Sequence, residues 1–205
     1  MKLRTLLCAF VCGAVVMLFA SRVVSQNDAG LSDDELRRAV EQAASLSKYH
    51  KNLKSIRGKY EQTIQWWAAP GAEPKESTCL ADTEWILGGR FMMQTFEGKW
   101  LDKSFEAIGI LGYDKGAGQY NSVWMDTLGT KMLLSKGTLD DSGKAITMHG
   151  EYVDPVSGQT VKTRMIMQMP DRKGETSFEM YRTTSDGTEY KFLDLISKRK
   201  IVRGA

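Results

Sequence analysis

The chain has 205 residues, of which 42% are hydrophobic, and this is enough to bury a core without disulfides. It carries 28 Lys and Arg residues against 25 Asp and Glu residues, but three of the basic residues and none of the acidic ones lie in the first 25 positions. The rest of the chain is formally neutral, which argues against nucleic acid or an anionic surface as a partner.

The first 25 residues have the pattern of a secretory signal peptide. Residues 6–20 form an uncharged apolar run that follows two basic residues, and small or polar residues then lead to Ser25. Because a membrane-spanning helix needs about 20 apolar residues, the pattern favours a signal cleaved after Ser25 over a permanent anchor. We therefore expect an exported protein, periplasmic or secreted, whose only membrane contact is this segment if it is left uncleaved.

The mature chain is predicted to begin with a flexible terminus followed by an amphipathic helix, together spanning residues 26–48. Ser32 is a good N-cap, and Glu35 three residues later completes a capping box. The apolar spacing predicts a helix over 33–48. Its narrow, alanine-rich stripe favours packing on a neighbouring surface over insertion into a membrane.

Residues 49–200 read as one β domain. After a linking segment, in which Leu53 and Ile56 can plug the end of a sheet, alternating apolar and polar runs are separated by turn pairs containing glycine. The predicted strands are 59–67, 76–87, 90–97, 105–113, 119–126, 130–138, 144–152, 160–169, 175–184 and 188–197. The short connections predict an all-β, up-and-down antiparallel barrel of about ten strands, lipocalin- or calycin-like, with a two-sheet sandwich as the alternative.

Several motifs occur in a recognisable order: His50-Lys51-x-Leu53 before Gly58-x-Tyr60, then Leu87-Gly88-Gly89-Arg90-Phe91, then Gly112-Tyr113-Asp114 before Tyr120, Trp124 and Asp126, and finally Tyr190-Lys191-Phe192 and Lys198-Arg199. Together they resemble the bacterial family called domain of unknown function 1579. The resemblance implies a calycin-like barrel, often secreted, with no established activity. It also implies that Tyr60, where many members have tryptophan, closes the barrel by stacking with Arg199 or Lys198.

The inward faces of strands 90–97, 119–126 and 160–169 are the predicted lining of a binding site. Met165 and Met167 alternate along one strand, which fits either a core of adaptable side chains or a pliable apolar pocket. Asp126 shares a face with Trp124, and with Arg90 or Arg164 it would form either a polar anchor in the cavity or a structural ion pair. The candidate ligand-binding residues are Met93, Tyr120, Trp124, Asp126, Met165, Met167 and Arg90.

Known catalytic and cofactor motifs do not occur in the sequence. It has no nucleophile elbow, zinc-protease helix, phosphate loop or CxxC pair, so we assign no catalytic residue and lean against an enzyme. His50, His149 and Cys79 are too few and too scattered for a zinc site, and a single histidine is more often a structural residue than a haem ligand. We therefore expect no metal and no cofactor, and we expect Cys79 to be a buried apolar residue.

The sequence is compatible with three functions. The leading one is binding of a small apolar or amphipathic molecule inside the barrel. The second is a structural or interaction protein of the cell envelope, with a filled barrel and a contact surface on the helix and residues 68–75. The third is a hydrolase or isomerase built around Asp126 and an arginine.

Overall fold

The computed structural model describes residues 30–200, so the predicted signal segment 1–25 lies outside the described residues. The chain divides into two units, one ending at Ser45 and the other beginning at Leu46. The first contains helix α2 (Asp33–Ala44), which begins with the predicted capping box: the Ser32 N–H donates to Glu35 Oε2 at 2.9 Å. The helix ends four residues earlier than predicted, because the Ser45 hydroxyl donates to the Gln42 carbonyl at 2.7 Å and terminates it.

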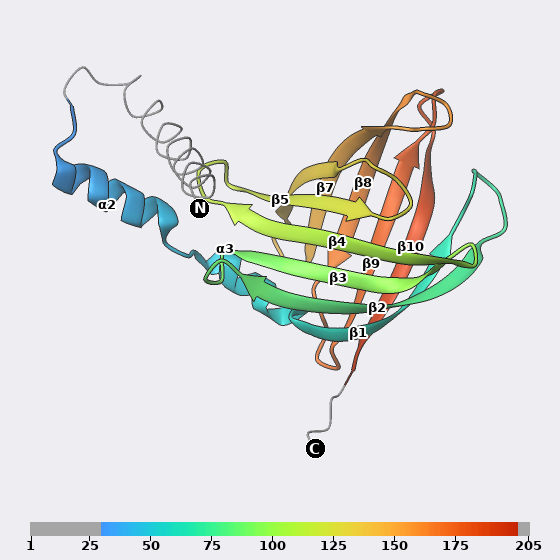
Figure 1. Ribbon diagram of the computed structural model, residues 1–205, viewed down its shortest axis with the longest axis horizontal. Helices are drawn as coiled ribbons and strands as arrows, with labels where there is room; N and C mark the ends of the chain where they lie inside the picture. Colours follow the sequence, from blue (N-terminus) through green and yellow to red (C-terminus); the bar gives the residue numbers. More distant parts are fainter. Residues whose placement is uncertain (1–29, 201–205) are drawn as a thin grey trace, which may run out of the picture. The chain divides into compact units, whose positions relative to one another are not determined.

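The second unit is a closed antiparallel barrel (Figure 1). Its strands are β1 (Gly58–Trp66), β2 (Lys75–Ile86), β3 (Phe91–Trp100), β4 (Lys103–Asp114), β5 (Gln119–Asp126), β6 (Leu133–Leu139), β7 (Ala145–Val153), β8 (Thr160–Gln168), β9 (Glu175–Thr183) and β10 (Glu189–Arg199). Each strand pairs with its neighbours in sequence, and β1 pairs with β10. The predicted up-and-down barrel of about ten strands is confirmed, and the sandwich alternative is wrong.

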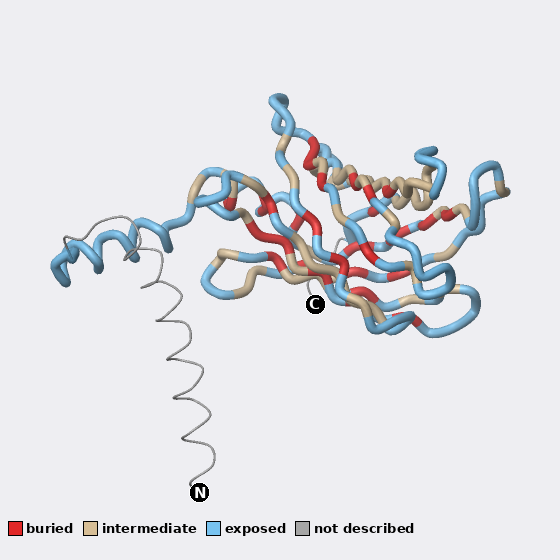
Figure 2. The backbone as a smooth tube through the Cα atoms, turned by 90° about the horizontal axis from the view of Figure 1, so that it is seen from above, coloured by how far each residue is buried: buried red, intermediate tan, exposed pale blue. Residues whose placement is uncertain are grey.

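Alternation along each strand separates an inner face from an outer one. In β1 the side chains of Tyr60, Gln62, Ile64 and Trp66 are buried, whereas the residues between them are exposed or half-buried. Buried and exposed positions alternate in the same way along much of the barrel (Figure 2). The interior of the barrel is therefore the hydrophobic core of this unit.

A short helical segment closes one end of the barrel. It consists of α3 (Lys48–Asn52) and the 3-10 turn η1 (Leu53–Ile56), and both Leu53 and Ile56 are buried, as predicted. The Tyr120 hydroxyl donates to the Tyr49 carbonyl at 3.0 Å, and the ring of Tyr49 stacks on that of Tyr113 at 4.5 Å. We call residues 48–56 the helical plug.

The contact between the first and last strands is the one implied by the family resemblance. Tyr60 lies opposite Arg199 in the β1–β10 register, and Arg199 Nη2 donates to the Tyr60 hydroxyl at 2.8 Å. The same nitrogen donates to the Ser55 carbonyl at 2.5 Å. Arg199, rather than Lys198, therefore joins the last strand to both the first strand and the helical plug.

The hairpin connections alternate between the two ends of the barrel, as in any up-and-down barrel. The turns that follow β2, β4, β6 and β8 lie at the end that holds the helical plug. We call the opposite end the loop end, and its connections are residues 67–74, 101–102, 127–132, 154–159 and 184–188.

Candidate functional site

The barrel encloses a cavity of about 380 Å³, and every strand contributes to its lining. Apolar side chains dominate the wall, including Phe96, Phe105, Trp124, Leu133, Met148, Met165, Met167, Phe178, Met180 and Phe192. Small-molecule sites are commonly apolar cavities of about 300–1,000 Å³. Both the size and the lining therefore fit a small, largely apolar guest.

Trp124 is the centre of an aromatic wall in this cavity. Its ring centroid lies 4.8 Å from that of Phe96 and 6.4 Å from that of Phe105. Its indole Nε1–H donates to Asp126 Oδ2 at 2.8 Å, while the other oxygen of Asp126 accepts the backbone N–H of Leu128 at 3.0 Å. Asp126 therefore orients the indole ring and ties it to the 127–132 loop.

Four of the seven candidate residues line the cavity: Trp124, Asp126, Met165 and Met167. Tyr120 is fully buried on the inner face, but it is absent from the lining because its ring packs in an edge-on contact against Tyr113 and its hydroxyl binds the helical plug. Its role in this structure is to hold the plug in place.

The placement of Met93 was wrong by one residue. Met92 is fully buried on the inner face of β3, and Met93 is half-buried opposite Glu84 and Ile110 on the outer face. In a strand, a shift of one position moves a side chain to the opposite face of the sheet. Met93 is not part of the lining.

The proposed pairing of Arg90 with Asp126 was also wrong. Arg90 lies in the β2–β3 turn, where its Nη1 donates to the carbonyls of Leu87 and Gly88 at 3.3 and 3.4 Å. The neighbouring Phe91 pairs with Gly112, whereas Asp126 pairs with Ala107, five positions nearer the start of β4. At about 3.3 Å per residue the two side chains belong to opposite ends of the barrel.

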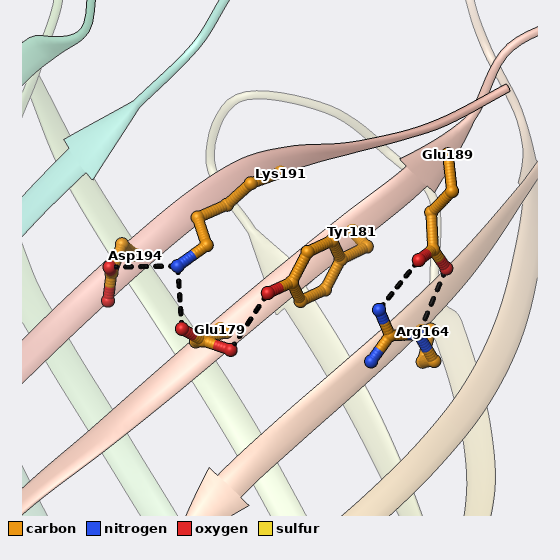
Figure 3. A network of polar contacts seen from close by, with 6 residues as sticks. All are labelled: Arg164, Glu179, Tyr181, Glu189, Lys191 and Asp194. Atoms are coloured by element: carbon orange, nitrogen blue, oxygen red, sulfur yellow. Dashed lines mark hydrogen bonds and ion pairs between the residues drawn. The ribbon is translucent and has the colours of Figure 1, made fainter.

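Arg164 does not contact Asp126 either, because it belongs to a polar network on the outer face (Figure 3). Its Nε and Nη2 donate to the two carboxylate oxygens of Glu189 at 2.9 and 2.6 Å, and its guanidinium lies over the Tyr181 ring. In the same network Lys191 Nζ binds Glu179 at 2.6 Å, and this hydrogen bond holds the pKa of Glu179 below its usual range.

Arg182 and Tyr152 are polar residues of the cavity lining that were not among the candidates predicted from the sequence. The Arg182 guanidinium lies 3.2 Å from the Phe192 ring centroid and 5.5 Å from that of Tyr152. The Arg182 Nε atom and the Tyr152 hydroxyl are both buried without a hydrogen-bond partner. Arg182 follows the inward-facing Met180 by two positions, and that spacing was the available signal.

Cys79 is buried, as predicted, and His50 is buried in the helical plug. The Cys79 thiol lines the cavity and donates to Gln62 Oε1 at 3.0 Å, and burial raises its pKa to about 11. His50 Nδ1 accepts the Ser47 N–H at 3.1 Å in the helical plug, and burial lowers its pKa, with a further contribution from nearby positive charge. Within residues 30–200 no cluster of three or more His, Cys, Asp or Glu side chains has the arrangement needed for a metal ion.

A second hollow, of about 580 Å³, lies along strands β5 to β8. Its lining includes Lys136, His149, Glu151 and Lys162, and Leu134 is its one large apolar side chain. Although this hollow is the larger of the two, its lining suits an apolar guest less well than that of the inner cavity.

Residues 45–199 match the family model described as "Protein of unknown function (DUF1579)". The chain belongs to this family. The match confirms the resemblance found in the motifs, and it covers the whole of the DUF1579 barrel.

Two solved structures have a similar fold at low sequence identity. Rv2717c from M. tuberculosis aligns with a TM-score of 0.55 and 14% identity, over 77% of this chain and 100% of that one. The S-type phycobiliprotein lyase CPES from Guillardia theta aligns with a TM-score of 0.55 and 9% identity, over 80% of this chain and 98% of that one. At these identities the similarity shows the barrel fold alone. No curated protein matches the sequence.

Proposed function

We propose that this protein binds a small, largely apolar molecule inside its barrel. The observation that supports this most directly is the cavity of about 380 Å³ with its wall of aromatic and methionine side chains. Methionine adapts to irregular shapes, so Met165 and Met167 suit a pocket that accommodates a flexible guest. The bound molecule would contact the Trp124 face and displace solvent from apolar surface.

The cavity favours this function over the other two hypotheses. A filled barrel acting only through its outer surface would have a packed interior, whereas this one has room for a ligand. For an enzyme built on Asp126, the proposed arginine partners Arg90 and Arg164 are engaged elsewhere, and the Asp126 carboxylate already accepts two hydrogen bonds. We therefore favour a binding protein.

The test is displacement of a neutral fluorescent probe from the purified protein. After removal of co-purified lipid, N-phenyl-1-naphthylamine should bind with increased fluorescence, and decanol should displace it. The variant Gly109→Leu places a new side chain in the cavity wall and should abolish both effects, whereas Thr95→Leu, exposed on the neighbouring strand, should leave them unchanged. Equal binding by Gly109→Leu and the unaltered protein would place the probe outside the cavity and contradict the proposal.

We also propose that the protein is exported. The support is the uncharged apolar run at residues 6–20 with its basic flank. None of the helices among residues 30–200 has the length and apolar character needed to cross a membrane. N-terminal sequencing of the protein recovered from its cellular compartment should give a chain beginning at Gln26, and recovery of an unprocessed chain from the cytoplasm would contradict export.

A further inference from the structure

The charges around the inner cavity are not balanced, although the chain after residue 25 is formally neutral. The lining contains Lys131 and Arg182 on the basic side and Asp126 on the acidic side, while Lys99 borders the cavity from an outward-facing position of β3. Among residues 30–200, no further charged residue contributes to this lining. The interior and its rim therefore present an excess of positive charge to a guest.

Arg182 has none of the partners that a partly buried guanidinium normally has. Among residues 30–200 it forms no ion pair, and its buried Nε has no hydrogen-bond acceptor. Its guanidinium lies 3.2 Å from the ring centroid of Phe192 and 5.5 Å from that of Tyr152, and its charge contributes slightly to lowering the pKa of Asp154. Arg182 is half-buried, and its Nε–H, which is shielded from water and has no acceptor, costs free energy because it loses its hydration.

Arg164, on the adjacent strand β8, shows the usual arrangement. It also stacks on an aromatic ring, that of Tyr181, but its Nε and Nη2 form a two-pronged pair with the carboxylate of Glu189 (Figure 3). Arg182 also lies over an aromatic ring, but no carboxylate of residues 30–200 pairs with it. A carboxylate from a bound molecule could therefore form with Arg182 the pair that Glu189 forms with Arg164.

The nearby protein carboxylates are already engaged. Asp126 accepts hydrogen bonds from Trp124 and Leu128. The pKa of Asp154 is lowered mainly by its bond from the Ser157 N–H, and the charge of Arg182 is the smallest of the contributions. No carboxylate of residues 30–200 forms an ion pair with Arg182.

The basic groups gather at the loop end of the barrel. Arg182 and Tyr152 lie one residue before the ends of β9 and β7, and Lys131 lies in the 127–132 loop with its ammonium 5.3 Å from the Tyr152 ring centroid. The helical plug is at the opposite end. A guest with a charged head and an apolar body would therefore place the head among these residues and the body deeper in the barrel.

We propose that the ligand carries a carboxylate, which pairs with the Arg182 guanidinium and accepts a hydrogen bond from the Tyr152 hydroxyl, while its apolar body contacts Trp124 and Met165. This inference rests on the proposed function and assigns its ligand class. A carboxylate has two oxygens at the spacing of the arginine Nε and Nη donors, and such pairs are among the strongest hydrogen bonds in proteins. Lys131 attracts the head and does not need to touch it.

The test compares decanoate with decanol, which has the same chain length and no charge, by displacement of N-phenyl-1-naphthylamine from protein made from the full-length gene. Decanoate should bind at least about tenfold more tightly than decanol, since hydrogen bonds to charged groups are the strong ones. Arg182→Met keeps an unbranched apolar side chain without the charge and should remove that advantage while leaving decanol affinity within about threefold. Tyr152→Phe should reduce the advantage in part.

The control is Arg164→Met, which removes an arginine from the outer face and should leave the decanoate advantage intact. If decanol and decanoate bind equally to the unaltered protein, the carboxylate inference is wrong and the apolar cavity stands. If neither displaces the probe, the proposed function itself is wrong. Should Arg182→Met fail to fold, Tyr152→Phe and Lys131→Met provide the test, and unchanged selectivity in both would overturn the inference.

Discussion

Gly109 provides the most direct test of whether the barrel is hollow. It is buried on the inner face of β4 and lines the cavity, and its backbone is in an ordinary extended conformation. A Cβ added there would lie 3.5 Å from Trp124, 3.7 Å from Gln94 and 3.8 Å from Phe96, all ordinary van der Waals distances. A leucine at this position would therefore extend its branch into the cavity, where the proposed ligand would bind.

We expect Gly109→Leu to stabilise the ligand-free protein. Replacing glycine at a compatible position contributes about 0.4–1 kcal/mol by restricting the unfolded chain. Each further buried methyl or methylene group contributes about 0.8 kcal/mol. With partial burial of the branch the total is about 2 kcal/mol, which corresponds to a rise in Tm of about 4–8 °C for a domain of this size.

The assay is urea unfolding followed by tryptophan fluorescence, with thermal unfolding as a second measure. Thr95→Leu on the outer face of β3 is the control and should change the unfolding free energy by less than about 0.5 kcal/mol. If the interior were tightly packed, the added leucine would instead destabilise the protein by about 1–3 kcal/mol. A destabilised Gly109→Leu variant that still binds the probe would refute the cavity as the binding site.

Three further predictions concern separate features of the barrel. Gly137→Ala should destabilise the protein strongly in urea, because its Cβ would lie 1.8 Å from the Thr147 carbonyl oxygen, and a normal urea midpoint would contradict that close approach. Glu179 has a lowered pKa in the folded state, chiefly through Lys191, so its stabilisation is present above its ordinary pKa and is lost as the pH falls through the lowered value. The stability difference between the protein and Glu179→Gln should therefore shrink on acidification, and a difference independent of pH would refute this. With a pKa of about 11, roughly one Cys79 thiol in a thousand is ionised at pH 8, so iodoacetamide should alkylate it slowly in the native protein. Fast alkylation would show that the thiol is not buried.

The strands were predictable because their periodicity is strong. The turn pairs with glycine separate runs in which most residues of one face are apolar, as in β1 and β8, and the observed bounds differ from the predicted ones by three residues or fewer. The helix was less predictable at its end. Ser45 satisfies the Gln42 carbonyl, and Ser47 begins α3 with the ring of His50 in the place usually taken by a Glu or Gln cap partner.

The cavity residues were harder to assign because the strand face is ambiguous where apolar residues are consecutive. Phe91, Met92 and Met93 are all apolar. The next inward residue, Gln94, is polar, and its side chain donates a hydrogen bond to the Thr83 hydroxyl at 3.2 Å inside the barrel. Because of the apolar run and the inward polar residue, the alternation of apolar and polar residues does not identify the inner face of β3. Arg182 was missed because an arginine on an inner face contradicts the apolar pattern used to find that face.

The pairing of β1 with β10 has a consequence for how this chain reaches its native state. The residues that form that seam, such as Tyr60 and Arg199, are separated by almost the whole length of the barrel sequence. A nascent chain therefore cannot close its sheet until the final strand has left the ribosome, and until then β1 keeps an unpaired edge that can associate with other chains. Premature termination before residue 189 would leave two such edges and expose the aromatic interior, so truncated products should aggregate rather than persist as smaller barrels.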